Sequence, residues 1–340
     1  MPVRMKDIAR DLGVSVVTVS KVLRNHSDIG EETRQRVLKR VRDLNYQPNF
    51  TARALVTGRT YIVGLVVPDL VHPFFAEVAK GLSSVLRKSG YSLIIASSEE
   101  DPDLEAQEIC RLLARRLDAM IVASAQWTVA SFRLIEEQKT PYILVDRQFA
   151  GLPANFVGVD DELVGELATD HLIAVGCRRI AHIRGPEVST ALGRLAGYKR
   201  ALARRDLRPP VHYIPEGMAG DDQSEARGRA AMRKLLQLDP PPDGVFCYND
   251  PTAVGAMNAI LEAGLRIPED IAVIGCGNVH YDASLRVPLS SIDQRSAVMG
   301  ERAGKLALSL ISSKGSTRPK SIILEPKLVA RASTQRSAST

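Results

Sequence analysis

Residues Met5 to Leu23, MKDIARDLGVSVVTVSKVL, have the pattern of two short helices joined by a tight turn. Apolar residues in the first half recur at the i, i+3, i+4, i+7 spacing of one helix face: Met5, Ile8, Ala9 and Leu12. Gly13 ends this helix, because a residue without Cβ adopts the left-handed conformation that a sharp reversal needs. Ser15 is placed to cap a second helix, whose apolar positions are Val16, Val19, Val22 and Leu23.

The outward face of this second helix carries Val17, Thr18, Ser20 and Lys21. A short helix with small hydroxyl residues and one cation on its free face suits the major groove of DNA. An ordinary helical hairpin with a solvated face has the same pattern. This stretch by itself therefore leaves both interpretations open.

Basic charge is concentrated at the start of the chain. Residues 1–59 contain 12 Lys and Arg against 6 Asp and Glu, so their net charge of +6 equals that of the whole 340-residue chain. The remaining residues are therefore neutral overall. A basic region confined to a small N-terminal unit is expected when that unit alone contacts phosphate, and a neutral body argues against a general polyanion binder.

The chain is long enough for two or three domains. A third helix expected over Gly30–Asn45 completes a small helix-turn-helix domain, residues 1–48. Pro48 ends that helix, and Asn49 is placed to cap a short helix that Gly58 ends. So short a helix forms only when something else holds it. Residues 49–59 are therefore interpreted as a hinge helix and linker, with a plain linker as the alternative.

From Tyr61 onward, apolar strand candidates alternate with amphipathic helices, which predicts an α/β body of parallel, doubly wound sheets. The expected strands are Tyr61–Val67, Tyr91–Ala96, Ala119–Ala123, Tyr142–Val145, Arg179–Ile183, Val211–Ile214, Gly244–Cys247, Ile271–Ile274 and Ser321–Leu324. The expected helices are Phe74–Ser89, Leu104–Leu117, Glu162–Val175, Leu192–Arg204, Ser224–Leu238, Pro251–Ala263 and Val298–Ser312.

So long a body is expected to form two lobes rather than one sheet, and together they span residues 60–330. We assign about 60–160 with 291–319 to one lobe, 161–290 with 320–330 to the other, and 331–340 to a flexible tail. Ligands of such folds lie at the carboxyl ends of the strands, so a cleft between the lobes is the expected binding site.

Several function classes lack support in the sequence. The four cysteines show no C-x-x-C spacing, so neither a zinc site nor a disulfide framework is suggested. No cofactor and no metal are expected. No secretory signal or membrane-spanning run is visible, which predicts a cytoplasmic protein without a membrane partner. No catalytic residue is assigned, because no Ser/His/Asp order, metal-spaced His cluster or phosphate-binding glycine loop occurs. His72 and His182 are expected to be structural or cleft-lining.

The sequence MKDIARDLGVSVVTVSKVL, followed by EETRQRVLKRVRDLNYQPNFTARAL, resembles the head of LacI (lactose repressor) and purine repressor family regulators. The body segments follow that family in order, from about Arg4 to Ala330: VGLVVPDLVHPFFAEVAKG, ILVDR, VGVDD, GRLAGYKRAL, VFCYNDPTAVGAM and GLRIPEDIAVIG. The resemblance implies a homodimeric transcription factor, most simply a repressor, that binds palindromic operator DNA. It also implies a body like periplasmic sugar-binding proteins, with a small-molecule effector such as a sugar or another metabolite.

The family's DNA-contacting positions correspond here to Lys6, Ser15, Val16, Val17, Thr18, Ser20, Lys21, Asn49, Arg53 and Leu55. Val16 and Val17 match the positions that chiefly vary with the operator, and as apolar residues they are expected to contact thymine methyls. Lys21 replaces a common Arg, and its point charge cannot form a bidentate fork with guanine. Leu55 matches the leucine that opens a central base step from the minor groove. A core contact between head and body is the alternative for Leu55.

The implied effector-binding residues are Asp69, Phe74, Phe75, Arg147, Arg194, Asn249 and Asp250. Arg194 matches the position that binds hydroxyl or carboxylate groups of the ligand. Core packing is the alternative role for Phe74 and Phe75. Asp250 is also placed to cap the helix that starts at Pro251.

Two departures from the family pattern concern the effector. Gly277 stands where relatives usually carry an acid that binds sugar hydroxyls, and residues 220–225, around Asp222, lack an aromatic residue that stacks on a sugar or purine ring. Both departures argue against a standard sugar or purine effector. An unusual ligand and a weakly responsive protein both remain open.

The expected mechanism is lobe closure on a ligand, which changes the separation of the two Asn49–Thr57 segments in a dimer and so their pairing in the minor groove. The tail lacks leucine heptads, so a dimer is expected rather than a zipper-joined tetramer. Two alternatives stand beside the regulator: a cytoplasmic small-molecule-binding module and an uncharacterised α/β enzyme. The basic head favours the regulator over the first, and a turnover assay would separate the second.

Overall fold

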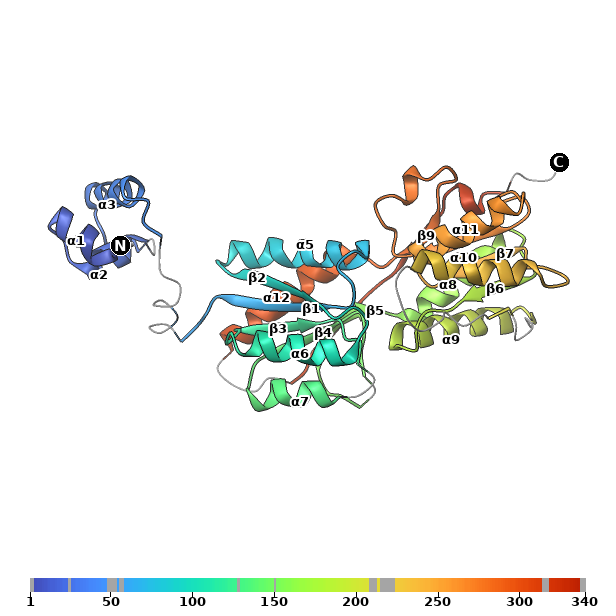
Figure 1. Cartoon of the computed structure of the whole chain (residues 1–340), viewed down its shortest axis with the longest axis horizontal. Helices are drawn as coiled ribbons and strands as arrows, with labels where there is room; N and C mark the ends of the chain where they lie inside the picture. Colours follow the sequence, from blue (N-terminus) through green and yellow to red (C-terminus); the bar gives the residue numbers. More distant parts are fainter. Residues whose placement is uncertain are drawn as a thin grey trace. The chain divides into compact units, whose positions relative to one another are not determined.

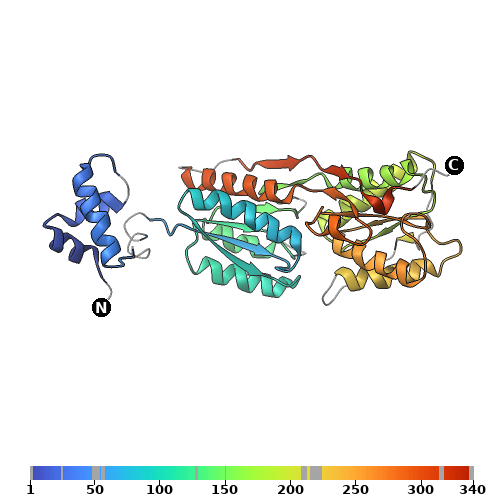
Figure 2. The same cartoon turned by 90° about the horizontal axis from the view of Figure 1, so that it is seen from above.

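The structure, a computed structural model of the 340-residue chain, describes residues 3–23, 26–47, 54, 58–126, 129–149, 151–207, 213–214, 224–313 and 318–336. The chain forms two compact units (Figures 1 and 2), residues 1–60, here the head, and residues 61–340, here the body. Most of the expected hinge helix lies outside the described residues, including Asn49, Arg53 and Leu55. Asp222 lies outside them as well.

Three helices lie wholly within the described part of the head: α1 (Met5–Leu12), α2 (Val16–Leu23) and α3 (Glu31–Asp43). Gly13 ends α1 at a φ of +66°, in the left-handed region expected for a tight reversal. The Ser15 hydroxyl accepts a hydrogen bond from the Thr18 amide at 3.0 Å, which caps the start of α2. Ile8, Val19 and Val37 have no exposed surface and form the small core between the three helices.

The first lobe of the body is built on a six-stranded parallel sheet in the order β10-β5-β4-β3-β1-β2. Its strands are β1 (Ile62–Val67), β2 (Ser92–Ser97), β3 (Ala119–Val122), β4 (Tyr142–Val145), β5 (Asn155–Val159) and β10 (Ser321–Leu324). Its helices are α5 (Pro73–Lys88), α6 (Pro102–Leu113), α7 (Ala130–Glu137) and α12 (Ser296–Ser312).

Helices cover both faces of this sheet, with α5 and α12 on one face and α6 and α7 on the other (Figure 1). The backbones of α5 and α12 approach closely, since a Cβ on Gly81 would lie 2.1 Å from the carbonyl oxygen of Ala297. Only glycine fits such a contact. The continuous apolar runs of the strands are therefore explained by burial from both sides.

The second lobe has a five-stranded sheet in the order β11-β9-β8-β7-β6, in which only β11 is antiparallel. Its strands are β6 (Ile180–Ile183), β7 (Gly244–Cys247), β8 (Ala272–Cys276), β9 (Ser290–Asp293) and β11 (Lys327–Val329). Helices α8 (Asp161–Ala174) and α9 (Ser189–Ala203) pack on one face, and α10 (Ser224–Leu236) and α11 (Asp250–Glu262) pack on the other.

The chain crosses between the lobes after β5, after β9 and after β10. This corrects the expected division, which gave residues 291–319 to the first lobe and 320–330 to the second. Strand β9 instead pairs with β8 in the second lobe, and β10 pairs with β5 in the first. A short strand joins the sheet whose neighbouring strand pairs with its backbone N–H and C=O groups. The strand's own sequence does not identify that neighbour.

The strand expected over Val211–Ile214 is not in either sheet as far as it is described, at Tyr213 and Ile214. Tyr213 is 3% exposed, packs against the core of the second lobe and donates a hydrogen bond from its hydroxyl to the Pro240 carbonyl at 2.6 Å. Tyr213 is therefore buried because it packs against this core, and not because it belongs to a strand.

Candidate functional site

Two exposed valines mark the free face of α2 in the head. Val16 is 43% exposed and Val17 is 61% exposed, whereas Val19 on the same helix has no exposed surface. Ser15 and Lys6 are also exposed, and Thr18 and Ser20 are partly buried. Two adjacent apolar side chains at the start of a short helix are therefore in contact with water. Exposed apolar surface of this kind is typical of a site that a partner covers.

Lys21 is less free than the sequence suggested, because its ammonium group forms an ion pair with Asp28 in the loop after α2. The hydrogen bond from Lys21 lowers the pKa of the Asp28 carboxyl. Another head cation is held in the same way, with Arg40 bound to Asp11. Part of the basic charge of the head therefore stabilises the three-helix unit, and the sequence reasoning missed Asp28.

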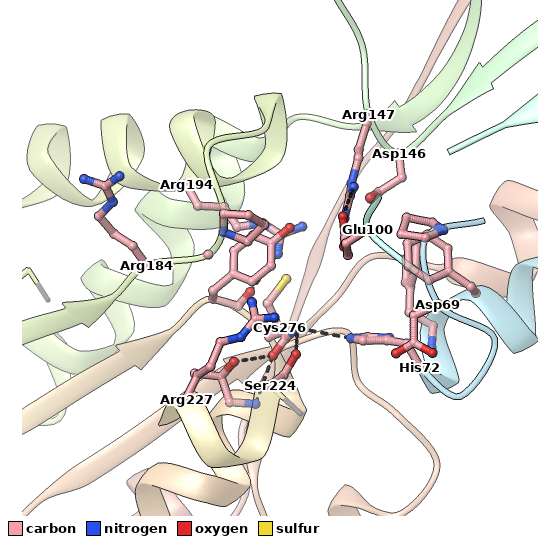
Figure 3. A pocket seen from close by; sticks show the side chains of 18 of the residues that line it. Asp69, His72, Glu100, Asp146, Arg147, Arg184, Arg194, Ser224, Arg227 and Cys276 are labelled. Carbon is pink, nitrogen blue, oxygen red and sulfur yellow. Dashed lines mark hydrogen bonds and ion pairs between the residues drawn. The ribbon is translucent and has the colours of Figure 1, made fainter. Parts of the chain in front are cut away.

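The body contains a cavity of about 550 Å³ between its lobes, at the carboxyl ends of strands from both sheets (Figure 3). Six of the seven expected effector residues line it: Asp69, Phe74, Phe75, Arg147, Arg194 and Asn249. The described lining also includes residues that sequence reasoning missed, among them Glu100, Asp146, Arg184, Arg227 and Tyr248.

Arg147 is fixed in the first lobe by a bidentate ion pair. Its two terminal nitrogens donate to the Glu100 carboxylate at 2.7 and 2.6 Å, and one of them also donates to the Ser124 carbonyl at 3.1 Å. Burial opposes ionisation of Glu100, yet the bonds and charge of Arg147 hold the pKa of Glu100 below its ordinary value. Arg147 is 4% exposed, and its Nε is buried without a hydrogen-bond partner.

Arg194 on α9 is the corresponding buried cation of the second lobe, with 3% exposure. Its Nε donates to Asp161 at 2.9 Å, a terminal nitrogen donates to the Tyr248 carbonyl at 2.7 Å, and the guanidinium carbon lies 4.7 Å from the centre of the Tyr248 ring. Burial raises the pKa of Asp161 to about 7, against the attraction of Arg194. Burial likewise raises the pKa of Asp146, which lies in the field of both arginines.

Asn249 connects the two lobes. Its side-chain oxygen accepts from the Thr252 amide at 2.9 Å and so caps α11, which leaves its NH₂ group 3.1 Å from Nε2 of His72 on the first lobe. Burial lowers the pKa of His72 to about 4, so its imidazole is neutral at pH 7. His72 Nδ1 lies 3.3 Å from the Phe74 amide at the start of α5. A neutral imidazole has one acceptor nitrogen, which serves either the helix cap or the contact between lobes.

Asp250 does not line the cavity, which corrects its expected role, and the α11 cap is Asn249 rather than Asp250. The Asp250 carboxylate is fully buried and accepts from the Ser291 hydroxyl at 2.7 Å and the Val279 amide at 3.1 Å. It reaches inward because the neighbouring chain is glycine there: a Cβ on Gly275 would lie 2.2 Å from Asp250 Oδ1.

The carboxyl group beside Asp250 belongs to Asp282, which has no exposed surface and forms a side-chain hydrogen bond with Asp250. Burial and the charge of Asp250 raise the pKa of Asp282 to about 9. Two buried carboxyl groups in contact share a proton, because both cannot ionise together. This pair is thus a structural element of the second lobe behind the cavity.

Phe74 and Phe75 fill both roles that the sequence left open. They are 4% and 6% exposed, belong to the core of the first lobe, and also line the cavity. Gly277 does not line the cavity; its φ is +135°, and a Cβ there would lie 2.8 Å from Asp250 Oδ2. His182, expected to be structural or cleft-lining, is fully buried in the second lobe and bonds to the Phe246 carbonyl at 3.0 Å.

A three-helix head and a two-lobed body with a polar cavity together define a helix-turn-helix regulator with a binding-protein-like body. Comparison with known proteins agrees: residues 4–49 match the profile of bacterial regulatory proteins, lacI family, and residues 169–334 match that of the periplasmic binding protein-like domain. The chain is 32% identical over 331 residues to the HTH-type transcriptional repressor PurR of Histophilus somni strain 129Pt, covering 97% of this chain and 98% of that protein.

Solved structures show the same relationship. The lac repressor dimer bound to operator and the anti-inducer ONPF matches with a TM-score of 0.85 at 26% identity, over 99% of this chain and 100% of that one. The transcriptional regulator CelR in complex with cellobiose matches with a TM-score of 0.73 at 28% identity, over 97% and 99%. The chain belongs to the lacI family of bacterial regulatory proteins. It is therefore a DNA-binding transcriptional regulator rather than an enzyme, and the predicted fold class is confirmed.

Two further observations concern the described part of the chain. No group of three or more His, Cys, Asp or Glu there is placed to hold a metal ion. No helix among those same residues is both long and apolar enough to cross a membrane.

Proposed function

We propose that the protein is a cytoplasmic homodimeric repressor whose affinity for a palindromic operator is changed by a small molecule bound between the lobes of the body. The observation that carries this proposal is the cavity of about 550 Å³, because side chains from both lobes line it. A ligand that contacts both walls favours one lobe arrangement over others, and that differential affinity is what an allosteric effector requires.

The free face of α2 supports the DNA-binding half of the proposal. Val16 and Val17 expose apolar surface that matches the thymine methyl groups of the major groove, and Ser15, Thr18 and Ser20 lie along the same short helix. Lys6 and Lys21 supply charge for the phosphate backbone, although Lys21 must share its contact with Asp28. The lac repressor that matches this chain was solved as a dimer on its operator, which favours a dimer on a palindromic site here.

Asn49, Arg53 and Leu55 remain proposed DNA contacts of the hinge. If Leu55 opens a base step from the minor groove, Leu55→Ala should weaken specific operator binding and leave non-specific binding nearly unchanged. Competition with random duplex in a fluorescence-anisotropy titration measures both quantities. Equal operator affinity of the variant and the parent protein would reject the wedge role for Leu55.

The proposed function is tested by selecting bound duplexes from a random pool with the full-length protein, then titrating metabolites onto the selected sequence. A palindromic consensus is expected, with an affinity that changes about 5- to 150-fold when the effector is present. Arg194→Gln should reduce the effector response, and urea unfolding of the variant must show that the body stays folded, because Arg194 also binds the buried Asp161. A protein that shows no sequence preference at physiological ionic strength would refute the proposal.

A further inference from the structure

The charged residues that line the cavity are divided by sign between the two lobes. In the second lobe the described charged lining residues are all arginines: Arg184, Arg194 and Arg227. In the first lobe they are five acids and one cation: Asp69, Glu99, Glu100, Asp101, Asp146 and Arg147. Figure 3 shows Arg194 and Arg227 on one side of the cavity, with Glu100, Asp146 and Asp69 on the other. A ligand in this cavity therefore meets donors on one wall and acceptors on the other.

Several of these groups are already held by partners within the protein. Arg147 binds Glu100 through two hydrogen bonds, and Arg194 binds Asp161. Asp101 caps α6 by accepting from the Asp103 amide at 2.8 Å. The guanidinium of Arg184 lies 3.4 Å from Glu187, and Figure 3 shows it extending away from the other labelled side chains. These residues shape the walls, but their charges are largely compensated without a ligand.

Arg227 differs from them. It lies in the first turn of α10, it is half-buried, and its Nε is buried without a hydrogen-bond partner. A guanidinium stays charged at every physiological pH. An exposed guanidinium N–H donates to water, whereas the buried Nε–H of Arg227 has no acceptor. The charge of Arg227 contributes to lowering the pKa of Glu100 on the first lobe. Arg147 already binds both oxygens of that carboxylate, however.

Arg147 adds a second unpartnered donor to the cavity lining, because its own Nε is also buried without a partner. The two orphaned N–H groups belong to different lobes, with Arg147 in the first and Arg227 in the second. An oxyanion accepts hydrogen bonds only, and it makes its strongest bonds with guanidinium groups. A neutral molecule in the same place would leave the Arg227 charge uncompensated.

We propose that the effector is a small hydroxylated anion, either a carboxylic acid or a phosphate ester, whose acidic group binds Arg227. Its hydroxyl groups donate to the carboxylates of the first lobe, such as Asp69 and Glu99, which act only as acceptors when ionised. This inference rests on the proposed function, since it concerns the same cavity. It excludes the neutral sugar as the tightest ligand and assigns Arg227 as the residue that determines this specificity.

The test compares ligands that share a carbon skeleton but differ in charge. Glucose, gluconate and glucose 6-phosphate, together with ribose and ribose 5-phosphate, are titrated onto the full-length protein by calorimetry without DNA, at constant ionic strength. At least one anion should bind about 10- to 100-fold more tightly than its neutral counterpart. The carboxylate and phosphate arms identify which acid is recognised. Binding of the neutral sugars alone, equal binding within each set, or no binding at all would overturn the inference.

Two variants of α10 localise the effect. Arg227→Gln should remove the preference for the anion, and Arg229→Gln is the matched control, since Arg229 lies 3.1 Å from Glu262 rather than in the cavity lining. Arg227→Lys should retain part of the affinity because it keeps the charge. Unchanged anion affinity in Arg227→Gln would remove the assignment of this residue.

The failure of this inference is separable from failure of the proposed function. Anion binding that leaves operator affinity unchanged would refute allosteric control and keep the ligand class. Release of the operator by a neutral sugar would support allosteric control and refute the ligand class.

Discussion

The exposed face of α2 in the head and the cavity of the body place their charged and apolar groups in opposite ways. On α2, Val16 and Val17 are exposed, and the cation Lys21 is in a solvent-accessible ion pair with Asp28. In the cavity, Arg147 and Arg194 are nearly inaccessible and each is fixed by several hydrogen bonds. A surface of the first kind can change its specificity at little cost to stability. The cavity, in contrast, is rigid, and replacing its buried arginines also destabilises the fold.

The largest effect expected from this difference is at Arg194. Arg194→Ala would leave the Asp161 carboxylate buried without its cation, so the body should lose about 3–5 kcal/mol of stability against urea. The double variant with Asp161→Asn should recover part of that loss, because the unpaired charge is then absent. Additive losses in this double-mutant cycle would show that the pair is not coupled and would weaken the contrast with the head.

The Asp250–Asp282 pair gives the next effect and sharpens the contrast through pH. The pKa of Asp282 is raised to about 9 from an ordinary 3.8, so the folded protein keeps a proton that the unfolded chain releases. Stability should therefore fall as the pH rises from 4 toward 9, with a slope on the order of 1 kcal/mol per pH unit. Asp282→Asn should remove that component, because the amide donates to Asp250 at every pH.

Urea unfolding of both proteins at pH 5.5, 7 and 8.5 measures the difference. Comparing the two proteins isolates Asp282, since Asp161, with a pKa of about 7, acts in the same direction, and His72, at about 4, opposes it only in acid. Parallel stability curves for the two proteins would show that no proton is held by the pair.

In the head, Val17→Ser should weaken operator binding by about 1–2 kcal/mol, with most of the loss at one base pair, because the proposed contact of Val17 with a thymine methyl would be removed. Stability should change by less than about 0.5 kcal/mol, as expected for an exposed position. Val19→Ser is the matched control, since Val19 is fully buried and its replacement should unfold the head rather than alter specificity. If the Val17 variant keeps the base preference of the parent protein, Val17 does not contribute to base recognition.

The smallest effect is expected at Asp28. Asp28→Asn releases Lys21 from its ion pair, which should change the stability of the head by no more than about 0.5 kcal/mol. Non-specific DNA affinity should rise, and the slope of log affinity against log salt should steepen by about one charge. Salt titrations with a random duplex measure this. An unaltered slope would mean that Lys21 does not contact phosphate.

Sequence reasoning succeeded where a local pattern determines the structure. The Gly13 turn and the apolar faces of the first two helices follow from residue spacing, and long apolar strands such as β1 are recognisable by composition alone. Placing the cavity at the carboxyl ends of strands required only the parallel alternation of strands and helices. The strands β5, β9 and β11 and the helix α7 were not expected, because they are short and take their definition from their neighbours.

The parts of the site that sequence could not predict are pairings across long separations. Glu100 lies 47 residues from Arg147 in the chain, and His72 lies 177 residues from Asn249. The direction of the Asp250 side chain depends on the space left by Gly275. No position of the family pattern corresponded to Arg227. This residue stands out only in the structure, where it lines the cavity and its Nε has no hydrogen-bond partner.

The three passages of the chain between the lobes have a consequence for synthesis on the ribosome. The head, with its own three-helix core, can fold as soon as it emerges. Neither sheet of the body is complete until residues 290–329 have been made, because β10 is an edge strand of the first sheet, and β9 with the edge strand β11 completes the second. A nascent chain therefore carries a folded DNA-binding head before it has a finished sensor, and a chain truncated near residue 285 would leave both lobes incomplete at once.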